Sequence, residues 1–204
     1  MPGSSAHWND VYATKAEDAV SWFEESPERS LAMIARTGVA KDDPVIDIGG
    51  GLSRLADALL AEGYADVSVL DISREAIDRL IARNGGDARL TGIVSDITTF
   101  APPHRYALWH DRAVLHFLTG EADQAAYRAA LMTGLAPGGH LVVATFAPDG
   151  PEKCSGLPVR CYGLDDFDAF FGPQFSRVSD ERFTHVTPSG AEQRFQAAHY
   201  RRRG

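Results

Sequence analysis

The sequence has few of the features that mark specialised classes of protein. Only two cysteines, Cys154 and Cys161, occur in 204 residues, and they lack the His or Cys neighbours of a zinc-binding spacing. Two cysteines cannot brace a chain of this length with disulfide bonds. We therefore expect free thiols, a cytoplasmic location and no metal site.

Long apolar runs and an excess of positive charge are also missing. No stretch approaches the roughly 20 apolar residues of a membrane-spanning helix, and residues 1–5 lack the charged and apolar parts of a signal peptide. The formal net charge is −8 and the one basic run is at 201–203, which argues against nucleic-acid binding. We expect no membrane or nucleic-acid partner, and a monomer or weak homodimer.

What the sequence does contain is a glycine cluster directly after a buried strand. Residues 44–48 are mostly branched and apolar, Gly49, Gly50 and Gly51 follow, and 52–60 repeat apolar residues at helical spacing. Glycine permits positive φ and the close approach of a ligand, and the N-terminus of a helix offers unpaired N–H groups. A strand, a tight turn and a helix in this order predict a mononucleotide-binding unit.

Two departures from the dinucleotide-binding pattern narrow the choice of ligand. Arg54 stands at the third glycine position of that pattern, and Asp47 places a carboxylate two residues before the first glycine. A negative charge there disfavours a diphosphate and suits a cationic amino group. The pattern Asp47-x-Gly49-x-Gly51 resembles motif I of the class I S-adenosylmethionine-dependent methyltransferases. In that family the acidic residue lies near the methionine amino group, so the resemblance implies S-adenosylmethionine as the cofactor.

Strands and helices alternate along the chain, which predicts an α/β fold with a Rossmann-like, doubly wound and mostly parallel sheet. The resemblance implies seven strands, with an antiparallel strand near the C-terminus. The expected strands are 45–48, 66–70, 90–94, 106–109, 140–146, 175–183 and 191–200, and the expected helices are 52–62, 74–83, 121–135 and 164–171.

We expect a single methyltransferase domain, 1–204, made of an N-terminal helical lid (1–40), a cofactor-binding core (41–146), and a substrate loop with a closing hairpin (147–204). The aromatic-rich first part has two interpretations. Its helices cover one edge of the sheet, or they close over the cofactor with Tyr12 and Trp22 at their polar end, as in many methyltransferases.

Carboxylates follow the first three expected strands, at the edge where ligands of doubly wound sheets bind. Asp71 has about the spacing of a residue that accepts both ribose hydroxyls, and Ile72 follows it. Asp96 and Ile97 resemble the family's adenine-binding pair, in which a carboxylate accepts from the exocyclic amine and an apolar side chain packs on the ring. We also assign His110 to the cofactor site.

The segment after the fourth strand is where we expect the chemistry. Asp111-Arg112-Ala113-Val114-Leu115 is similar to the Asp-Arg-Gly-Ala-Leu segment of thiopurine methyltransferases, where the Asp and Arg face the acceptor. On a helix after the strand, Arg112 and His116 would share one face. Asp111 or His116 would take a proton, and Arg112 would stabilise a thiolate or hold an acidic substrate. The structural alternative is an Arg–Asp pair that orders a strand end and a histidine that packs in the core.

The remaining candidates are expected to contact the acceptor. They are Trp8, Phe117, and Cys154, Arg160 and Tyr162 in the loop 150–162. The predicted function is in-line transfer of a methyl group from S-adenosylmethionine to a small molecule, with a thiol, whose unperturbed pKa is near 8.5, as one such acceptor. The alternatives are a protein-lysine N-methyltransferase and a non-catalytic or NAD-binding nucleotide sensor.

Overall fold

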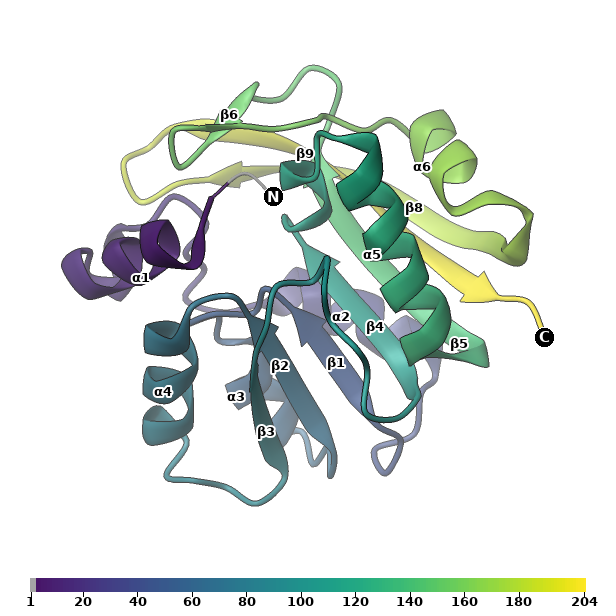
Figure 1. Ribbon diagram of the computed structural model, residues 1–204, viewed down its shortest axis with the longest axis horizontal. Helices are drawn as coiled ribbons and strands as arrows, with labels where there is room; N and C mark the ends of the chain where they lie inside the picture. Colours follow the sequence, from purple (N-terminus) through teal and green to yellow (C-terminus); the bar gives the residue numbers. More distant parts are fainter. Residues whose placement is uncertain (1–2) are drawn as a thin grey trace.

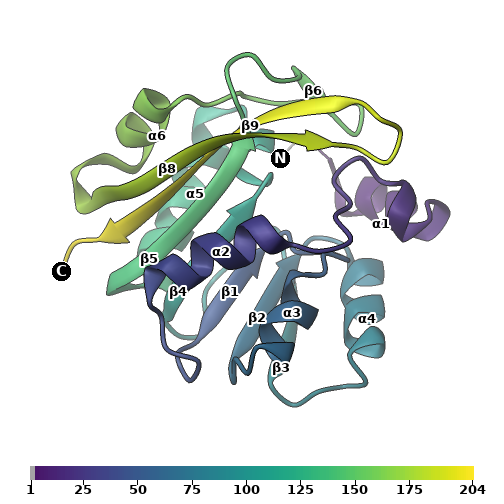
Figure 2. The ribbon, with the colours of Figure 1, turned by 180° about the vertical axis from the view of Figure 1, so that it is seen from behind.

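A seven-stranded sheet with helices on both faces forms the framework of the computed structural model, which describes residues 3–204 (Figures 1 and 2). Its strands are β1 (Val45–Ile48), β2 (Val67–Asp71), β3 (Leu90–Val94), β4 (Tyr106–Arg112), β5 (Leu135–Phe146), β8 (Phe175–Val186) and β9 (Glu192–Arg202). The order is β3-β2-β1-β4-β5-β9-β8. Strands β1 to β5 are parallel, and β9 lies antiparallel between β5 and β8. The predicted fold class is confirmed.

Alternation along the strands divides the core into two layers. Val45 and Asp47 face one side of β1, and Ile46 and Ile48 face the other, so the strand is buried on both faces. The first side packs against α2 (Glu28–Thr37), α3 (Leu55–Ala61) and α4 (Arg74–Arg83), and the second against α5 (Glu121–Gly134) and α6 (Leu164–Phe171).

The remaining elements lie at the ends of this framework. Figure 1 shows α1 (Ser5–Thr14) beside the end of α4, near the carboxyl ends of β1 and β2. The short elements are η1 (Glu17–Ala19), η2 (Leu115–Phe117), η3 (Gly172–Gln174) and the hairpin β6 (Lys153–Cys154) and β7 (Leu157–Pro158). None of the helices in residues 3–204 has the length and apolar character needed to cross a bilayer.

Most elements match their predicted bounds. Ser73 caps α4, with its Oγ accepting from the N–H of Ala76 at 3.2 Å. The start of β5 was predicted too late. Tyr106 already pairs with Leu135, and a register shift between Tyr106 and Leu108 accommodates Pro137, Gly138 and Gly139 within the strand. In the same way, β4 continues past Trp109 to Arg112.

Candidate cofactor and acceptor pocket

An open pocket of ≈ 950 Å³ lies at the carboxyl ends of β1, β2 and β4, beneath α1. Its position is the one at which doubly wound sheets bind ligands. The structure brings 13 of the predicted site residues to it: Trp8, Tyr12, Trp22, Asp47, Gly49, Gly50, Asp71, Ile72, Ile97, His110, Arg112, Phe117 and Cys154. Six others, Gly51, Asp96, Asp111, His116, Arg160 and Tyr162, are not in its lining.

The glycine turn leaves no room for side chains. Gly49 and Gly51 have φ values of 65° and 48°, a region that other residues rarely adopt. A Cβ on Gly51 would collide with the Tyr12 hydroxyl and lie 3.0 Å from Asp71 Oδ2, and one on Gly50 would lie 2.5 Å from Asp47 Oδ2. The turn is therefore a bare backbone between two carboxylates and Tyr12 of α1.

Asp71 ends β2 inside the pocket wall and is 5% exposed. Its Oδ1 accepts from the backbone N–H of Ser73 at 2.8 Å. Burial is the largest cause that raises the pKa of this carboxyl, to about 7, and the charge of Asp47 raises it further. A ligand that offers hydroxyl donors here would favour the charged carboxylate.

Asp47 does not stand alone on the α2 side of β1. Its Oδ1 lies 2.7 Å from Nδ1 of His110 in β4, and Nε2 of His110 lies 3.0 Å from Oγ of Ser30 in α2. All three residues are buried and line the pocket. The parallel register pairs Asp47 with His110, which explains why the two side chains meet.

At the third strand, the structure places the neighbours of Asp96 at the pocket instead of Asp96 itself. Asp96 Oδ1 accepts from the backbone N–H and the hydroxyl of Thr98, both at 2.8 Å, and so closes the turn after β3. Ser95 and Ile97 line the pocket. The predicted contact of Asp96 with adenine stays a prediction, and Ile97 lies where an adenine ring could pack.

The largest difference from the sequence prediction lies in the segment after Trp109. Because β4 continues to Arg112, successive side chains point to opposite faces: His110 and Arg112 toward the pocket, and Asp111 toward α5. Asp111 is fully buried and accepts from the Tyr127 hydroxyl at 2.7 Å and from the N–H of Val114 at 2.9 Å. Its placement contradicts a role in proton transfer, because its carboxylate holds the chain together behind the sheet.

His116 was expected to share a helical face with Arg112, but it lies in η2, outside the pocket lining. Its ring is fully buried against Phe117 and Phe146, with ring centroids 4.5 and 4.7 Å away. Neither ring nitrogen has a hydrogen-bond partner, and burial lowers the pKa of His116 to about 3. A histidine so weakly basic and so placed packs in the core, as the structural alternative held.

Arg160 and Tyr162 lie outside the pocket lining. Arg160 Nη1 donates to Gln124 Oε1 at 3.3 Å, and its backbone N–H donates to the carbonyl of His116 at 2.8 Å. Tyr162 is fully buried and stacks on Phe167, with ring centroids 5.3 Å apart. These two residues fasten the loop 150–162 to the core, while Cys154 is the predicted loop residue that reaches the pocket.

Arg112 connects the pocket to the segment before α2. Its Nη2 donates to the backbone carbonyl of Trp22 at 3.0 Å and forms an ion pair of 3.1 Å with Glu24. Its Nε is buried with no hydrogen-bond partner. The next residue, Ala113, takes a φ of 70°, so the backbone keeps a conformation that favours glycine even though a side chain is present.

The helix α1 lies over the pocket, because Trp8 and Tyr12 both line it. Two contacts with α4 hold it there: Asn9 Oδ1 accepts from the Ser73 hydroxyl at 2.7 Å, and Arg79 Nη1 donates to the carbonyl of Tyr12 at 2.6 Å. This position fits the lid interpretation better than that of a cover along a sheet edge.

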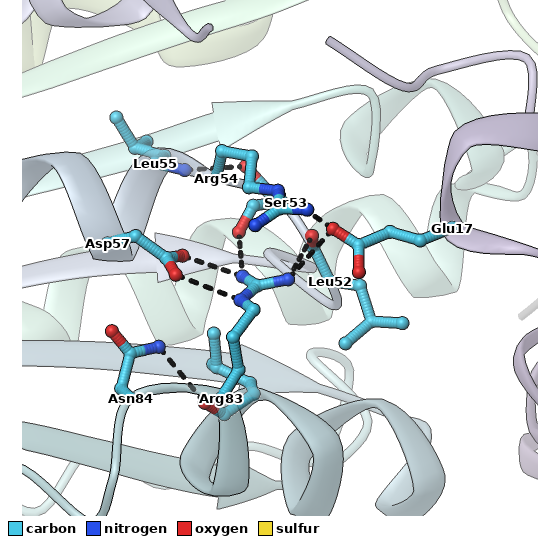
Figure 3. A network of polar contacts seen from close by, with 9 residues as sticks. Glu17, Leu52, Ser53, Arg54, Leu55, Asp57, Arg83 and Asn84 are labelled. Atoms are coloured by element: carbon cyan, nitrogen blue, oxygen red, sulfur yellow. Dashed lines mark hydrogen bonds and ion pairs between the residues drawn. The ribbon is translucent and has the colours of Figure 1, made fainter. Parts of the chain in front are cut away.

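A second set of contacts fastens the segment after α1 to the glycine loop, as Figure 3 shows. Glu17 Oε1 lies 2.9 Å from both Arg83 Nη1 and Arg54 Nε. Arg83 also donates to the carbonyls of Leu52 and Ser53 and pairs with Asp57 at 2.6 Å. Arg54, which replaces the third glycine of the dinucleotide pattern, thus links the turn to the lid.

Sequence reasoning missed several pocket residues. Ser30 and Pro27 lie at the start of α2, and Ser95, Ala113 and Val114 flank residues that were predicted. No motif marks Ser30 or Pro27, because they reach the pocket only through the packing of α2 on the sheet.

Comparison with known proteins identifies the class to which this architecture belongs. No protein-family model matches the chain. The fold is nevertheless that of the class I S-adenosylmethionine-dependent methyltransferases, since solved structures of this class superpose on nearly the whole chain. The predicted fold is thereby confirmed.

Among individual proteins, the chain is similar to Nodulation protein S of Rhizobium tropici, at 36% identity over 83 residues. This match spans 41% of the chain and 35% of that protein, so the aligned part is about a third of the relative's length. The structure of N-methyltransferase NodS from Bradyrhizobium japonicum WM9 with S-adenosylhomocysteine has a TM-score of 0.76 at 17% identity and covers 98% of each chain. A structure solved in work on the conversion of a disulfide bond into a thioacetal group during echinomycin biosynthesis has a TM-score of 0.75 at 20% identity, covering 96% of this chain and 90% of that one.

Proposed function

We propose that this protein is an S-adenosylmethionine-dependent methyltransferase that acts on a small-molecule acceptor. The observation that carries the proposal is one pocket that joins a bare glycine turn to two buried carboxylates, Asp47 and Asp71, at the edge where this fold binds its ligands. The NodS structure with S-adenosylhomocysteine and other solved relatives with this product or with sinefungin support the choice of ligand.

The residues fit each part of this cofactor. Asp71 would accept from the ribose hydroxyls, since a carboxylate is an acceptor with two oxygens for two donors. Ile72 and Ile97 would pack against adenine, and Asp47 would face the methionine ammonium. The cofactor would supply an activated methyl group, and the chain would contribute orientation and exclusion of water by Tyr12 and the rest of the lid.

The other end of the pocket suits a small acceptor with apolar parts. Trp8 packs edge-on against both Trp22 and Phe117, with ring centroids 5.9 and 5.3 Å apart, and Cys154 and Arg112 complete this wall. The aromatic edges would hold a compact, apolar acceptor. Arg112 offers a positive group for an anionic substituent or for a thiolate.

The titratable groups of the pocket favour an acceptor that loses its proton easily. Asp111 and His116, the predicted bases, lie outside the lining. Burial raises the pKa of Tyr12 well above its ordinary value and that of Cys154 to about 11, so both side chains hold their protons at neutral pH. A thiol or a weakly basic nitrogen fits this site better than lysine, whose unperturbed pKa is near 10.4. Relatives described as N-methyltransferases support nitrogen, and the thioacetal-forming system supports sulfur.

The test is methyl transfer from methyl-labelled S-adenosylmethionine to a size-fractionated bacterial extract with added small thiols. We expect label in the low-mass fraction, and we expect Asp71→Asn to lack it. Label on a protein band would instead make the protein-lysine alternative the better account. Failure to bind S-adenosylhomocysteine, together with binding of NAD, would support a nucleotide sensor, and thermal stabilisation by each ligand separates the two.

A further inference from the structure

Three buried polar side chains from three elements form a hydrogen-bond network along one wall of the pocket. Asp47 in β1, His110 in β4 and Ser30 in α2 are joined by contacts of 2.7 Å and 3.0 Å. Their exposures are 4%, 4% and 7%. The proposed function uses the carboxylate of Asp47 alone and gives His110 and Ser30 no task.

The donor and acceptor groups of these side chains determine how the hydrogen-bond network is arranged. A carboxylate can only accept, so Nδ1 of His110 carries the hydrogen that points at Asp47 Oδ1. The Ser30 hydroxyl can donate to Nε2 of a neutral ring or accept from the Nε2–H of a charged one, so it holds the ring in either form. Ser30 therefore fixes the orientation of the His110 ring, and His110 holds one oxygen of Asp47.

The second oxygen of Asp47 is turned toward the glycine loop. Asp47 Oδ2 is the atom nearest to where a Cβ of Gly50 would lie, and Gly50 lines the pocket. A carboxylate with one oxygen fixed by His110 and the other beside a turn that lines the pocket is preorganised for a cation, because its orientation is set before a ligand binds.

We propose that His110 and Ser30 are positioning residues that aim Asp47 at the α-amino group of the cofactor, and so determine selectivity for ligands that carry the amino-acid part. This inference rests on the proposed function and assigns part of it. Through Ser30, the network also connects Asp47 to α2, which directly follows the segment that carries Trp22. Neither ring nitrogen of His110 is available to accept a proton from the methyl acceptor without breaking one of these contacts.

The experiment compares two ligands that differ in the part at issue. 5′-Methylthioadenosine shares the adenine, ribose and sulfur of S-adenosylhomocysteine but lacks the amino-acid part. Dissociation constants for both are measured calorimetrically with the wild-type chain, His110→Phe, His110→Asn and Ser30→Ala. Loss of a hydrogen bond to a charged group lowers the affinity by about 10- to 100-fold.

We expect His110→Phe to raise the dissociation constant of S-adenosylhomocysteine by about 10- to 100-fold and that of 5′-methylthioadenosine by less than about 3-fold. His110→Asn should restore part of the preference, since its amide can donate where Nδ1 does, and Ser30→Ala should lose about 3- to 10-fold. Ser68→Ala is the matched control: it removes a buried hydroxyl that accepts from Tyr106 at 3.4 Å, outside the pocket lining. It should leave the ratio of the two affinities unchanged.

If His110→Asn and Ser30→Ala weaken the binding of both ligands by the same factor, the ratio of the two affinities is unchanged. That result would show a merely structural role and overturn the inference. These two milder variants keep the test open if His110→Phe does not fold. Failure of the cofactor assignment on which this inference rests looks different, because the wild-type chain would then bind neither ligand.

Discussion

Glu17 and Arg83 form an ion pair of 2.9 Å that joins the segment after α1 to the last turn of α4 (Figure 3). Arg83 is 18% exposed and also holds the carbonyls of Leu52 and Ser53 in the glycine loop. One guanidinium thus links the segment after α1, the glycine turn and α4. If α1 closes over the cofactor as proposed, this link couples it to the turn.

Arg83→Met tests this link. Because the aliphatic stem is kept and the donors are lost, we expect the dissociation constant of S-adenosylhomocysteine to rise about 3- to 10-fold. Arg89→Met is the control, since Arg89 pairs locally with Asp87 at 2.6 Å. Calorimetric titration measures both, and equal affinities for Arg83→Met and wild type would show that the lid does not need this pair.

The contact between Gly51 and Tyr12 gives a second prediction. Gly51→Ala adds a Cβ that collides with the Tyr12 hydroxyl at a φ of 48°, so we expect a loss of about 1–3 kcal/mol in unfolding free energy and loss of ligand binding. On the Tyr12→Phe background the same change should cost less, because the colliding oxygen is gone. Urea unfolding of the four proteins measures this coupling. Additive effects would contradict the proposed packing of lid on turn.

Protonation of Asp71 should have opposite effects on the stability of the fold and on ligand binding. Its folded-state pKa of about 7 lies above the unfolded value near 3.9, so the folded chain binds this proton more tightly. The contribution of Asp71 to stability is therefore present at low pH and is lost as the pH rises toward 7. Three pKa units correspond to about 4 kcal/mol, which is the upper limit of the effect.

Asp71→Asn should consequently be more stable than wild type at pH 8 and equally stable near pH 4, while its affinity for S-adenosylhomocysteine falls by more than about 10-fold. Wild-type affinity should also decline as the pH falls below about 7, because the carboxylate becomes protonated. Thermal unfolding and ligand titration across this range check both statements. A variant that is destabilised at pH 8 would contradict the burial argument.

Asp111 should affect stability and not ligand affinity. Asp111→Asn places an amide N–H among the N–H and O–H donors that the carboxylate now accepts, so we expect a loss of about 1–3 kcal/mol. Tyr127→Phe, which removes one of those donors, should cost about 1 kcal/mol. Denaturant midpoints and ligand titration give the two readouts. Wild-type stability combined with lost turnover would restore the catalytic role that the sequence had indicated.

The sequence was most informative where local chemistry decides the structure. Branched residues before glycine predicted β1 and its turn, and carboxylates at strand ends predicted that Asp47 and Asp71 would meet at one edge. These features depend on the order of residues along a few neighbouring positions.

Prediction failed where packing between distant segments decides. The end of β4 was set three residues too early, and in a strand such an extension determines which face each side chain takes, so Asp111 was assigned to the pocket and points to α5. Ser30 reaches His110 from a separate helix, and no sequence motif records that contact. His116 was given a chemical role because its full burial cannot be seen in the order of residues.

The most direct measurement is calorimetric titration of the purified chain with S-adenosylhomocysteine, with Asp71→Asn and NAD as comparisons. We expect one-to-one binding by the wild-type chain, at least about 10-fold weaker binding by Asp71→Asn, and no binding of NAD. Binding of NAD without S-adenosylhomocysteine, or equal binding by Asp71→Asn, would contradict the proposed cofactor site.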